Sequence, residues 1–181
     1  MNDAAPPRRI WLCADDYGLA EGVNRAIRDL ISRGRLNATS VMVVGPAIGR
    51  NEVAELQAVA AASPRCAIGL HATLTAPFRP LSMYFRPLHG GLFLPFPAML
   101  RSGLLRRLDP GLIEDELLAQ LAAFKELFGR APDFVDGHQH VQLFPQVRDG
   151  FLAAVKATAP GAWVRQGGRN GPLAKRLGAP K

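Results

Sequence analysis

Six acid and imidazole side chains stand where apolar runs of this chain give way to polar sequence. In chain order they are Asp15, Asp16, His71, Asp136, His138 and His140. Carboxylates together with imidazoles suit a borderline divalent metal such as zinc, and manganese, cobalt and magnesium accept related ligand sets. Three of the four histidines of the chain belong to these clusters. The pattern therefore predicts a hydrolytic metal site.

Each cluster also has an ordinary explanation when it is taken alone. Asp15 and Asp16 could form a turn and cap the next helix. A single histidine such as His71 is more often a polar residue satisfied by local hydrogen bonds than a metal ligand. His138 and His140, two positions apart after an acid, make a stronger pair. The metal-site hypothesis depends on the three clusters meeting in space.

Strand and helix patterns alternate along the chain, which indicates an α/β fold. Apolar or β-branched runs predict strands at 9–14, 39–44, 66–71, 134–136 and 162–164. Helical spacing of apolar residues, with glycine or proline stops, predicts helices at 21–33, 51–62, 111–128 and 147–159. The continuous hydrophobicity of the first strand is typical of a parallel sheet covered on both faces. We therefore expect about five strand–helix units.

Strand–helix repeats place the three clusters at one edge of the sheet. Such repeats imply parallel strands joined by right-handed crossovers. Ligands of these sheets gather beyond the carboxyl ends of the strands, where the loops begin. All three clusters stand at such ends, so we expect them to share one site.

The segment 73–110 interrupts this rhythm. It holds six prolines, and so long an insertion after a strand is more often a functional loop or lid than a plain connection. A short helix is expected within it, near 98–107. Because no internal repeat or linker divides the chain, residues 1–181 are predicted to form a single domain.

Composition predicts one globular domain with a real core, since 48% of the 181 residues are hydrophobic. No apolar run reaches the length of about 18 residues that crosses a bilayer. The apolar stretch 10–14 is too short for the core of a secretion signal. Cys13 and Cys66 fall in predicted strands, as buried thiols of a reducing compartment do, and a disulfide is the weaker alternative. A cytoplasmic location is predicted.

The formal net charge of +7 raises the question of an acidic partner. Arginines occur at 101, 106 and 107, and the end of the chain carries Arg165, Arg169, Lys175, Arg176 and Lys181. No recognition motif accompanies them and only 7% of residues are aromatic, so nucleic acid is not expected as a partner. A solvated basic surface is the simplest interpretation. Peripheral attraction to acidic membrane headgroups is the alternative.

Four motifs carry a resemblance to a known family. They are Ala14-Asp15-Asp16-Tyr17-Gly18-Leu19, Asn24-x-Ala26-Ile27, Gly69-Leu70-His71-x-Thr73-Leu74-Thr75 and Asp136-Gly137-His138-Gln139-His140-Val141. Together they resemble the YdjC-like carbohydrate deacetylases, relatives of the polysaccharide deacetylases. The run Trp163-Val164-Arg165-Gln166 is similar to the hopanoid-biosynthesis-associated branch. The resemblance implies a distorted (β/α) barrel that removes an acetyl group from an N-acetylated sugar, oligosaccharide or sugar-lipid with a metal-activated water.

The resemblance also implies residue roles. Asp16, His71 and His138 are the implied ligands of one divalent metal, zinc or magnesium first, with manganese or cobalt as alternatives; three protein ligands leave positions for water and the acetamide oxygen. Neighbouring residues at a strand end point apart, so Asp15 is expected to be the general base, held ionised and oriented by Arg165. Two residues after His138, His140 is expected on the same face, beside the ligands or at the substrate.

Two features depart from the family pattern. The third position of the expected His-x-His-x-His run is Gln142. A (β/α)₈ barrel typically takes about 250 residues, and the later histidine that resembles a general acid has no counterpart after His140. The C-terminal part of the barrel is therefore predicted to be missing, whether the chain is a fragment, is completed by a partner chain or is a degenerate member. An open sheet edge would favour a homodimer.

Two other functions compete with deacetylation. One is a catalytically impaired member of the same fold that binds a metal or a sugar without turnover. The other is a phosphoester hydrolase with the same ligands. That enzyme would call for a glycine loop that cradles phosphate or for a second metal site, and neither is evident.

Overall fold

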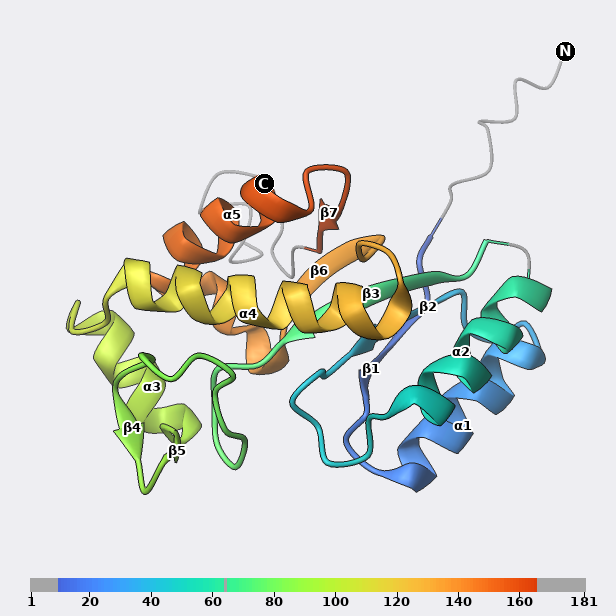
Figure 1. The fold of residues 1–181 in the computed structure, drawn as a ribbon, viewed down its shortest axis with the longest axis horizontal. Helices are drawn as coiled ribbons and strands as arrows, with labels where there is room; N and C mark the ends of the chain where they lie inside the picture. Colours follow the sequence, from blue (N-terminus) through green and yellow to red (C-terminus); the bar gives the residue numbers. More distant parts are fainter. Residues whose placement is uncertain (1–9, 64, 166–181) are drawn as a thin grey trace, which may run out of the picture.

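A parallel five-stranded sheet forms the centre of the computed structural model, which describes residues 10–63 and 65–165 (Figure 1). The strands, in their order across the sheet, are β1 (Cys13–Tyr17), β2 (Ala38–Val41), β3 (Ala67–Ala72), β6 (Phe134–Gly137) and β7 (Trp163–Val164). All four pairings between neighbours are parallel. The predicted α/β class with parallel strands is confirmed.

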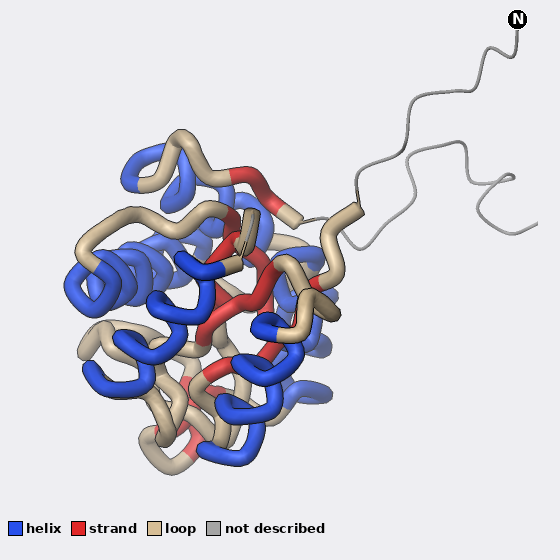
Figure 2. Tube along the Cα trace, turned by 90° about the vertical axis from the view of Figure 1, so that its right-hand side faces the viewer, coloured by secondary structure: helices blue, strands red, loops and turns tan. Residues whose placement is uncertain are grey.

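Helices pack on one face of this sheet. They are α1 (Glu21–Ser32), α2 (Arg50–Ala62), α4 (Pro110–Phe128) and α5 (Val147–Thr158). The first two pack together beside β1 and β2, and α4 packs on α5 beside β6 (Figure 1). Figure 2, turned by 90°, shows helices around the central strands. Ile68 and Leu70 of β3 and Val135 of β6 point into this main core, where each is at most 1% exposed.

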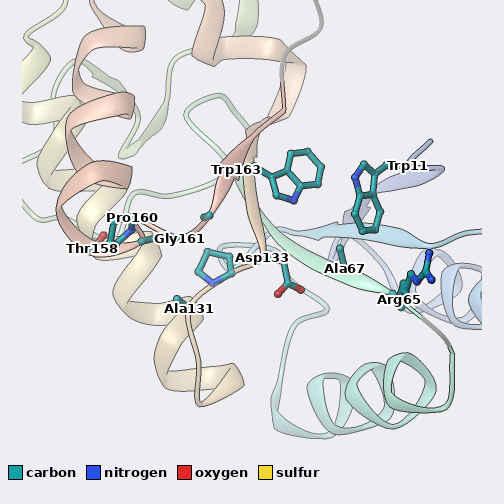
Figure 3. A pocket seen from close by; sticks show the side chains of 13 residues that line it. Trp11, Arg65, Ala67, Ala131, Asp133, Thr158, Pro160, Gly161 and Trp163 are labelled. Carbon is teal, nitrogen blue, oxygen red and sulfur yellow. The ribbon is translucent and has the colours of Figure 1, made fainter. Parts of the chain in front are cut away.

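The opposite face of the sheet is curved, and its two outer strands approach each other at their amino ends. Trp11, just before β1, stacks on Trp163 of β7 with ring centroids 5.7 Å apart (Figure 3). Trp163 also stacks on Phe134 of β6 at 4.5 Å. Within the described residues no backbone pairing joins β1 to β7, so these five strands form an open arc. Closure into a barrel stays a prediction, as does the organisation of the chain as a single domain.

Small residues make room for the aromatic stack. A Cβ atom on Gly69 of β3 would lie 2.6 Å from the ring of Phe134, so this position needs glycine. Ala38 and Ala67 complete the same apolar layer. Because side chains alternate along a strand, the next inward-pointing residues come two positions later, at the carboxyl ends of the strands.

The first strand differs from its predicted range. β1 pairs with β2 from Cys13 and Ala38 onward, whereas Trp11 and Leu12 are 49% and 50% exposed. A buried strand at 9–14 was therefore wrong, and Asp15 and Asp16 lie within the strand rather than after it. Both cysteines are free thiols, as the sequence favoured.

The proline-rich insertion contains more structure than the sequence predicted. The antiparallel pair β4 (Leu88–His89) and β5 (Leu92–Phe93) was not expected, because two-residue strands are too short to show periodicity. Helix α3 (Phe96–Leu104) begins and ends earlier than 98–107. Arg106 takes a left-handed φ of 53°, which ends the helix. The basic positions 169–181 lie outside the described residues.

Candidate metal and catalytic site

The inward layer at the carboxyl end of the sheet is polar. Each strand contributes one residue to it, or is followed by one: Asp15, Ser40, His71, Asp136 and Arg165. His71 and Asp136 are direct neighbours in the register of β3 and β6. Ala38, Phe134 and Trp163 of the apolar layer lie two residues earlier on their strands, and on β3 Gly69 takes that position. This arrangement gives a polar cluster with an apolar floor.

Asp15 and Asp16 are consecutive, yet both carboxylates reach this cluster. Consecutive side chains of a regular strand point to opposite faces. Here the pairing of β1 with β2 shifts between Ala14 and Tyr17, where one extra residue is inserted. Asp16 has a left-handed φ of 67°, and a bulge of this kind turns a side chain in a new direction. The prediction that the side chains of Asp15 and Asp16 point to opposite sides of the backbone was therefore wrong, because the bulge brings both carboxylates to one site.

Asp16, His71 and His138 converge on one point. Oδ1 of Asp16 lies 3.2 Å from Nε2 of His71 and 3.0 Å from Nδ1 of His138. One donor atom from each of the three residues lies within 4.8 Å of the others. Hydrogen bonds, first from His138 and then from His71, hold the pKa of Asp16 well below its usual range. One anionic oxygen and two imidazole nitrogens fit the donor preferences of a divalent metal such as zinc.

Two polar side chains on the Nδ1 side of the ring fix the orientation of His71. Its Nδ1 lies 2.5 Å from Oδ1 of Asp136 and 3.1 Å from Oγ of Ser40, which leaves Nε2 directed at Asp16. Burial opposes protonation of this imidazole, but hydrogen bonds with Asp136 and Asp16 outweigh it and raise the pKa of His71 to about 9. A carboxylate behind a ligand histidine is a common feature of metal sites. Sequence reasoning placed Asp136 in the third cluster but assigned it no role.

Arg165 lies between two of the acids. Its guanidinium donates a hydrogen bond of 2.7 Å to Oδ2 of Asp15. The same nitrogen is 2.7 Å from Oδ2 of Asp136, off line for a hydrogen bond but close enough for a strong charge contact. Burial opposes ionisation of Asp15, but the hydrogen bond from Arg165 and the charges of His71 and Arg165 outweigh it and lower the pKa of that carboxyl. The predicted Asp15–Arg165 contact is present.

The proline-rich insertion lies against the site. The ring of Phe78 packs edge-on against His138, with centroids 5.9 Å apart. The carboxylate of Glu116 on α4 accepts backbone N–H bonds from Leu81 and Ser82 at 3.1 and 2.7 Å. The insertion is thus anchored to a helix of the main core and covers one side of His138.

The turn after His138 separates it from His140. The chain leaves β6 at Gly137 and enters the short 3₁₀ segment η1 (His138–Leu143). Within it Gln139 and His140 have left-handed backbones, with φ of 55° and 58°. His140 is exposed, and this turn interrupts the strand alternation from which a position on the same face as His138 was expected. In the described residues no hydrogen bond or ion pair joins His140 to Asp16, His71 or His138, and its role stays a prediction.

Gln142, which replaces the expected third histidine, is buried. Its side chain is 4% exposed, and its Oε1 packs so close to Gly137 that a Cβ atom at that position would overlap it. Its amide donates weakly to the backbone oxygen of Arg165 at 3.5 Å. Gln142 therefore packs between the ends of β6 and β7 rather than among the side chains of Asp16, His71 and His138.

Residues 9–179 of the chain match the family model of the YdjC-like proteins. The chain belongs to this family. Over 150 residues it is 32% identical to the chitooligosaccharide deacetylase of Escherichia fergusonii, an alignment that covers 77% of this chain and 52% of that protein. Over 156 residues it is 33% identical to the human carbohydrate deacetylase, covering 84% of this chain and 46% of that protein. This YdjC-like chain thus spans about half the length of the curated relatives it matches.

A solved structure supports the fold of this YdjC-like protein. It is a protein of Enterococcus faecalis with a suggested role in cellobiose-phosphate cleavage, and it superposes with a TM-score of 0.74 at 22% identity. The superposition covers 93% of this chain and 62% of that one. At this identity the likeness concerns the fold alone. The assignment to the hopanoid-biosynthesis-associated branch stays a prediction.

Proposed function

We propose that this YdjC-like protein is a metal-dependent deacetylase that removes the acetyl group of an N-acetylated sugar, free or carried by an oligosaccharide or a lipid. The observation that carries the proposal is the convergence of Asp16, His71 and His138 beside an ionised Asp15. The names of the two deacetylase relatives support the reaction and the substrate class. One divalent ion is the proposed cofactor, with zinc or magnesium first and manganese or cobalt as alternatives.

The three converging residues would hold the metal. A divalent ion bound by Asp16, His71 and His138 would supply Lewis acidity, polarising the acetamide carbonyl and lowering the pKa of water. Asp136 keeps Nε2 of His71 directed at the ligand point, because it occupies Nδ1. In the metal-free protein the His71 proton must leave before that nitrogen can act as a ligand.

Asp15 is the proposed general base. Its pKa is lowered beside Arg165, so the carboxylate is ionised near neutral pH and can accept a proton from the attacking water. The hydrogen bond from Arg165 to Oδ2 fixes the orientation of the carboxylate, and Oδ1 accepts from Ser40 at 3.3 Å. The apolar floor formed by Phe134 and Trp163 limits water below the site.

Metal analysis and acetate release test the proposal together. The His71→Ala/His138→Ala double variant is expected to lose stoichiometric metal, whereas His89→Ala, a change at an exposed histidine of β4, keeps it. Asp15→Asn is expected to keep the metal and, in a form extended to the length of the curated relatives, to lose about 10²- to 10⁴-fold in acetate release from chitooligosaccharides. Asp149→Asn, at an acid that is 67% exposed, is the matched control. An unchanged metal content in the double variant would refute the assignment of His71 and His138 as metal ligands.

The binding alternative has a separate outcome in the same experiment. A protein that binds metal and sugar but releases no acetate under any condition would be the catalytically impaired member of the fold. If Asp15→Asn released acetate at the rate of the unmodified chain, Asp15 would not be the base, although the metal site would stand.

Location and self-association are proposed on the sequence alone. No helix in the described part of the chain is long and apolar enough to cross a bilayer. We propose a cytoplasmic protein with peripheral contact to a membrane, and a homodimer. Sedimentation of the purified chain tests the dimer.

A further inference from the structure

The end of α3 presents apolar and basic side chains to solvent together. We call residues 101–107 the α3 turn. Leu104 is 64% exposed and Leu105 is 50% exposed. Arg101, Arg106 and Arg107 flank them and are exposed too. Among the described residues none of these three arginines forms an ion pair, whereas Arg28, Arg130 and Arg165 each pair with an acid.

The neighbouring sequence supplies no negative charge to this turn. Residues 73–108 contain five arginines and neither aspartate nor glutamate. The first acid after them, Asp109, is engaged in capping α4, where its carboxylate accepts from the N–H groups of Gly111 and Leu112. The sequence around the α3 turn therefore does not neutralise its positive charge.

Backbone hydrogen bonds hold the turn in one shape. The N–H of Arg107 donates to the carbonyl of Ser102 at 2.9 Å, and that of Arg106 donates to Gly103 at 3.1 Å. With Arg106 in the left-handed conformation, these bonds form a Schellman motif. Gly103 packs close to the backbone oxygen of Pro145. Leu104 and Leu105 are consequently exposed by a defined turn rather than by a loose loop.

The α3 turn is attached to the segment that follows the ligand His138. The N–H of Leu108 donates to Oε1 of Gln146 at 3.1 Å. Phe96 at the start of α3 packs on Phe144, with ring centroids 5.8 Å apart. Figure 1 shows α3 beyond one end of α4, far from α1 and α2. A partner that bound the turn would therefore contact the half of the molecule that carries the insertion.

We propose that the α3 turn docks on a membrane surface that carries anionic lipid headgroups. Leucines that are exposed beside arginines match the interfacial zone, where apolar side chains enter the acyl boundary. Guanidinium groups bind lipid phosphates with two parallel hydrogen bonds. An anionic leaflet attracts each nearby cation. The inference does not rest on the proposed reaction, since binding to vesicles is measured without a substrate.

Vesicle sedimentation of the full chain tests this docking. The chain is expected to bind phosphatidylcholine vesicles that contain phosphatidylglycerol and to bind pure phosphatidylcholine weakly. Arg101→Gln/Arg107→Gln should weaken binding about 30-fold, the effect of two cationic contacts with an anionic surface. Leu104→Gln/Leu105→Gln should weaken it about tenfold, because two exposed leucines no longer enter the interface.

Two matched variants keep the test specific. Leu30→Gln/Leu152→Gln changes leucines that are 39% and 46% exposed on α1 and α5, and it should bind like the unmodified chain. Arg106→Gly removes one charge while fitting the left-handed position, so it should weaken binding about fivefold without disturbing the turn.

The opposite results would overturn the proposal. Binding that both α3-turn double variants leave unchanged would show that other basic residues, such as those at 169–181, attract the vesicles. Equal binding to vesicles with and without phosphatidylglycerol would exclude recognition of anionic headgroups. No binding at all would identify the turn as a solvated basic surface.

Discussion

Replacing Asn24 tests whether the bulge at Asp16 depends on support from behind. Asn24 is fully buried on α1. Its Oδ1 accepts the N–H of Gly18 at 2.7 Å, and its amide donates to the carbonyl of Ala47 and to Glu52 at 2.8 and 2.9 Å. These bonds fix the chain two residues after the left-handed Asp16. They also give a physical role to the Asn24-x-Ala26-Ile27 motif.

The loss of stability in Asn24→Ala follows from the hydrogen-bond partners that the variant leaves unpaired. The N–H of Gly18 and the carbonyl of Ala47 would lose these partners in a buried region, at about 1–3 kcal/mol each. Glu52 keeps its ion pair with Arg28 and its bond from Tyr17, so it adds little. We expect a loss of about 3 kcal/mol in the free energy of unfolding. The released turn should also weaken metal binding about 10- to 100-fold, as loss of an outer partner typically does.

A control of equal instability separates the two effects. Leu121→Ala, at a position 4% exposed on α4, should cost about the same stability without touching the bulge. Both variants are measured by urea denaturation and by zinc titration well below their melting temperatures. Asn24→Ala should bind zinc more weakly than Leu121→Ala. Equal zinc affinities in the two variants would refute the support of Asp16 by Asn24.

Three further predictions concern packing and protonation. Gly69→Ala should lose about 2 kcal/mol or more of stability, because its Cβ would overlap the ring of Phe134, and adding Phe134→Leu should restore part of it in denaturant titrations. Burial raises the pKa of Glu116 above its ordinary value of 4.5. The contribution of this group to stability is therefore complete below pH 4.5 and is lost as pH rises through the raised pKa. Glu116→Gln should flatten this part of the curve of stability against pH, and an unchanged slope would contradict the assignment. Burial also raises the pKa of Cys13 to about 12 and that of Cys66 above its ordinary value, so both thiols should react with iodoacetamide at neutral pH far more slowly than free cysteine.

The elements of this fold could be predicted because their signals are local. Helix α1, expected at 21–33, spans Glu21–Ser32, and α4, expected at 111–128, spans Pro110–Phe128. Apolar periodicity and a glycine stop depend only on neighbouring residues. The strand at 66–71 differs from β3 by one residue at each end. Parallel order then followed from the alternation of strands and helices.

The bulge and the orientation of His140 depend on tertiary structure. An extra residue in β1 becomes visible only when its pairing with β2 is known, since nothing in Asp15-Asp16 itself marks an irregular strand. His140 lies two positions after His138, which in an extended strand would place both on one face. The 3₁₀ turn after Gly137 removes that alternation. Spacing predicts a shared face only as long as the strand continues.

Asp136 shows why a cluster found in sequence does not reveal its own roles. Asp136 is 1% exposed and lies between His71 of β3 and Arg165, which follows β7. These three residues are far apart in the sequence. Asp15, Asp16 and Asp136 bring three carboxylates to one end of the sheet, while Arg165 is the one guanidinium that pairs with them in the described residues. Without a metal, the proton on His71, whose pKa is about 9, offsets part of the excess negative charge. A divalent ion would place two positive charges at that same point, so metal binding should release this proton and satisfy the charge balance that the three acids create.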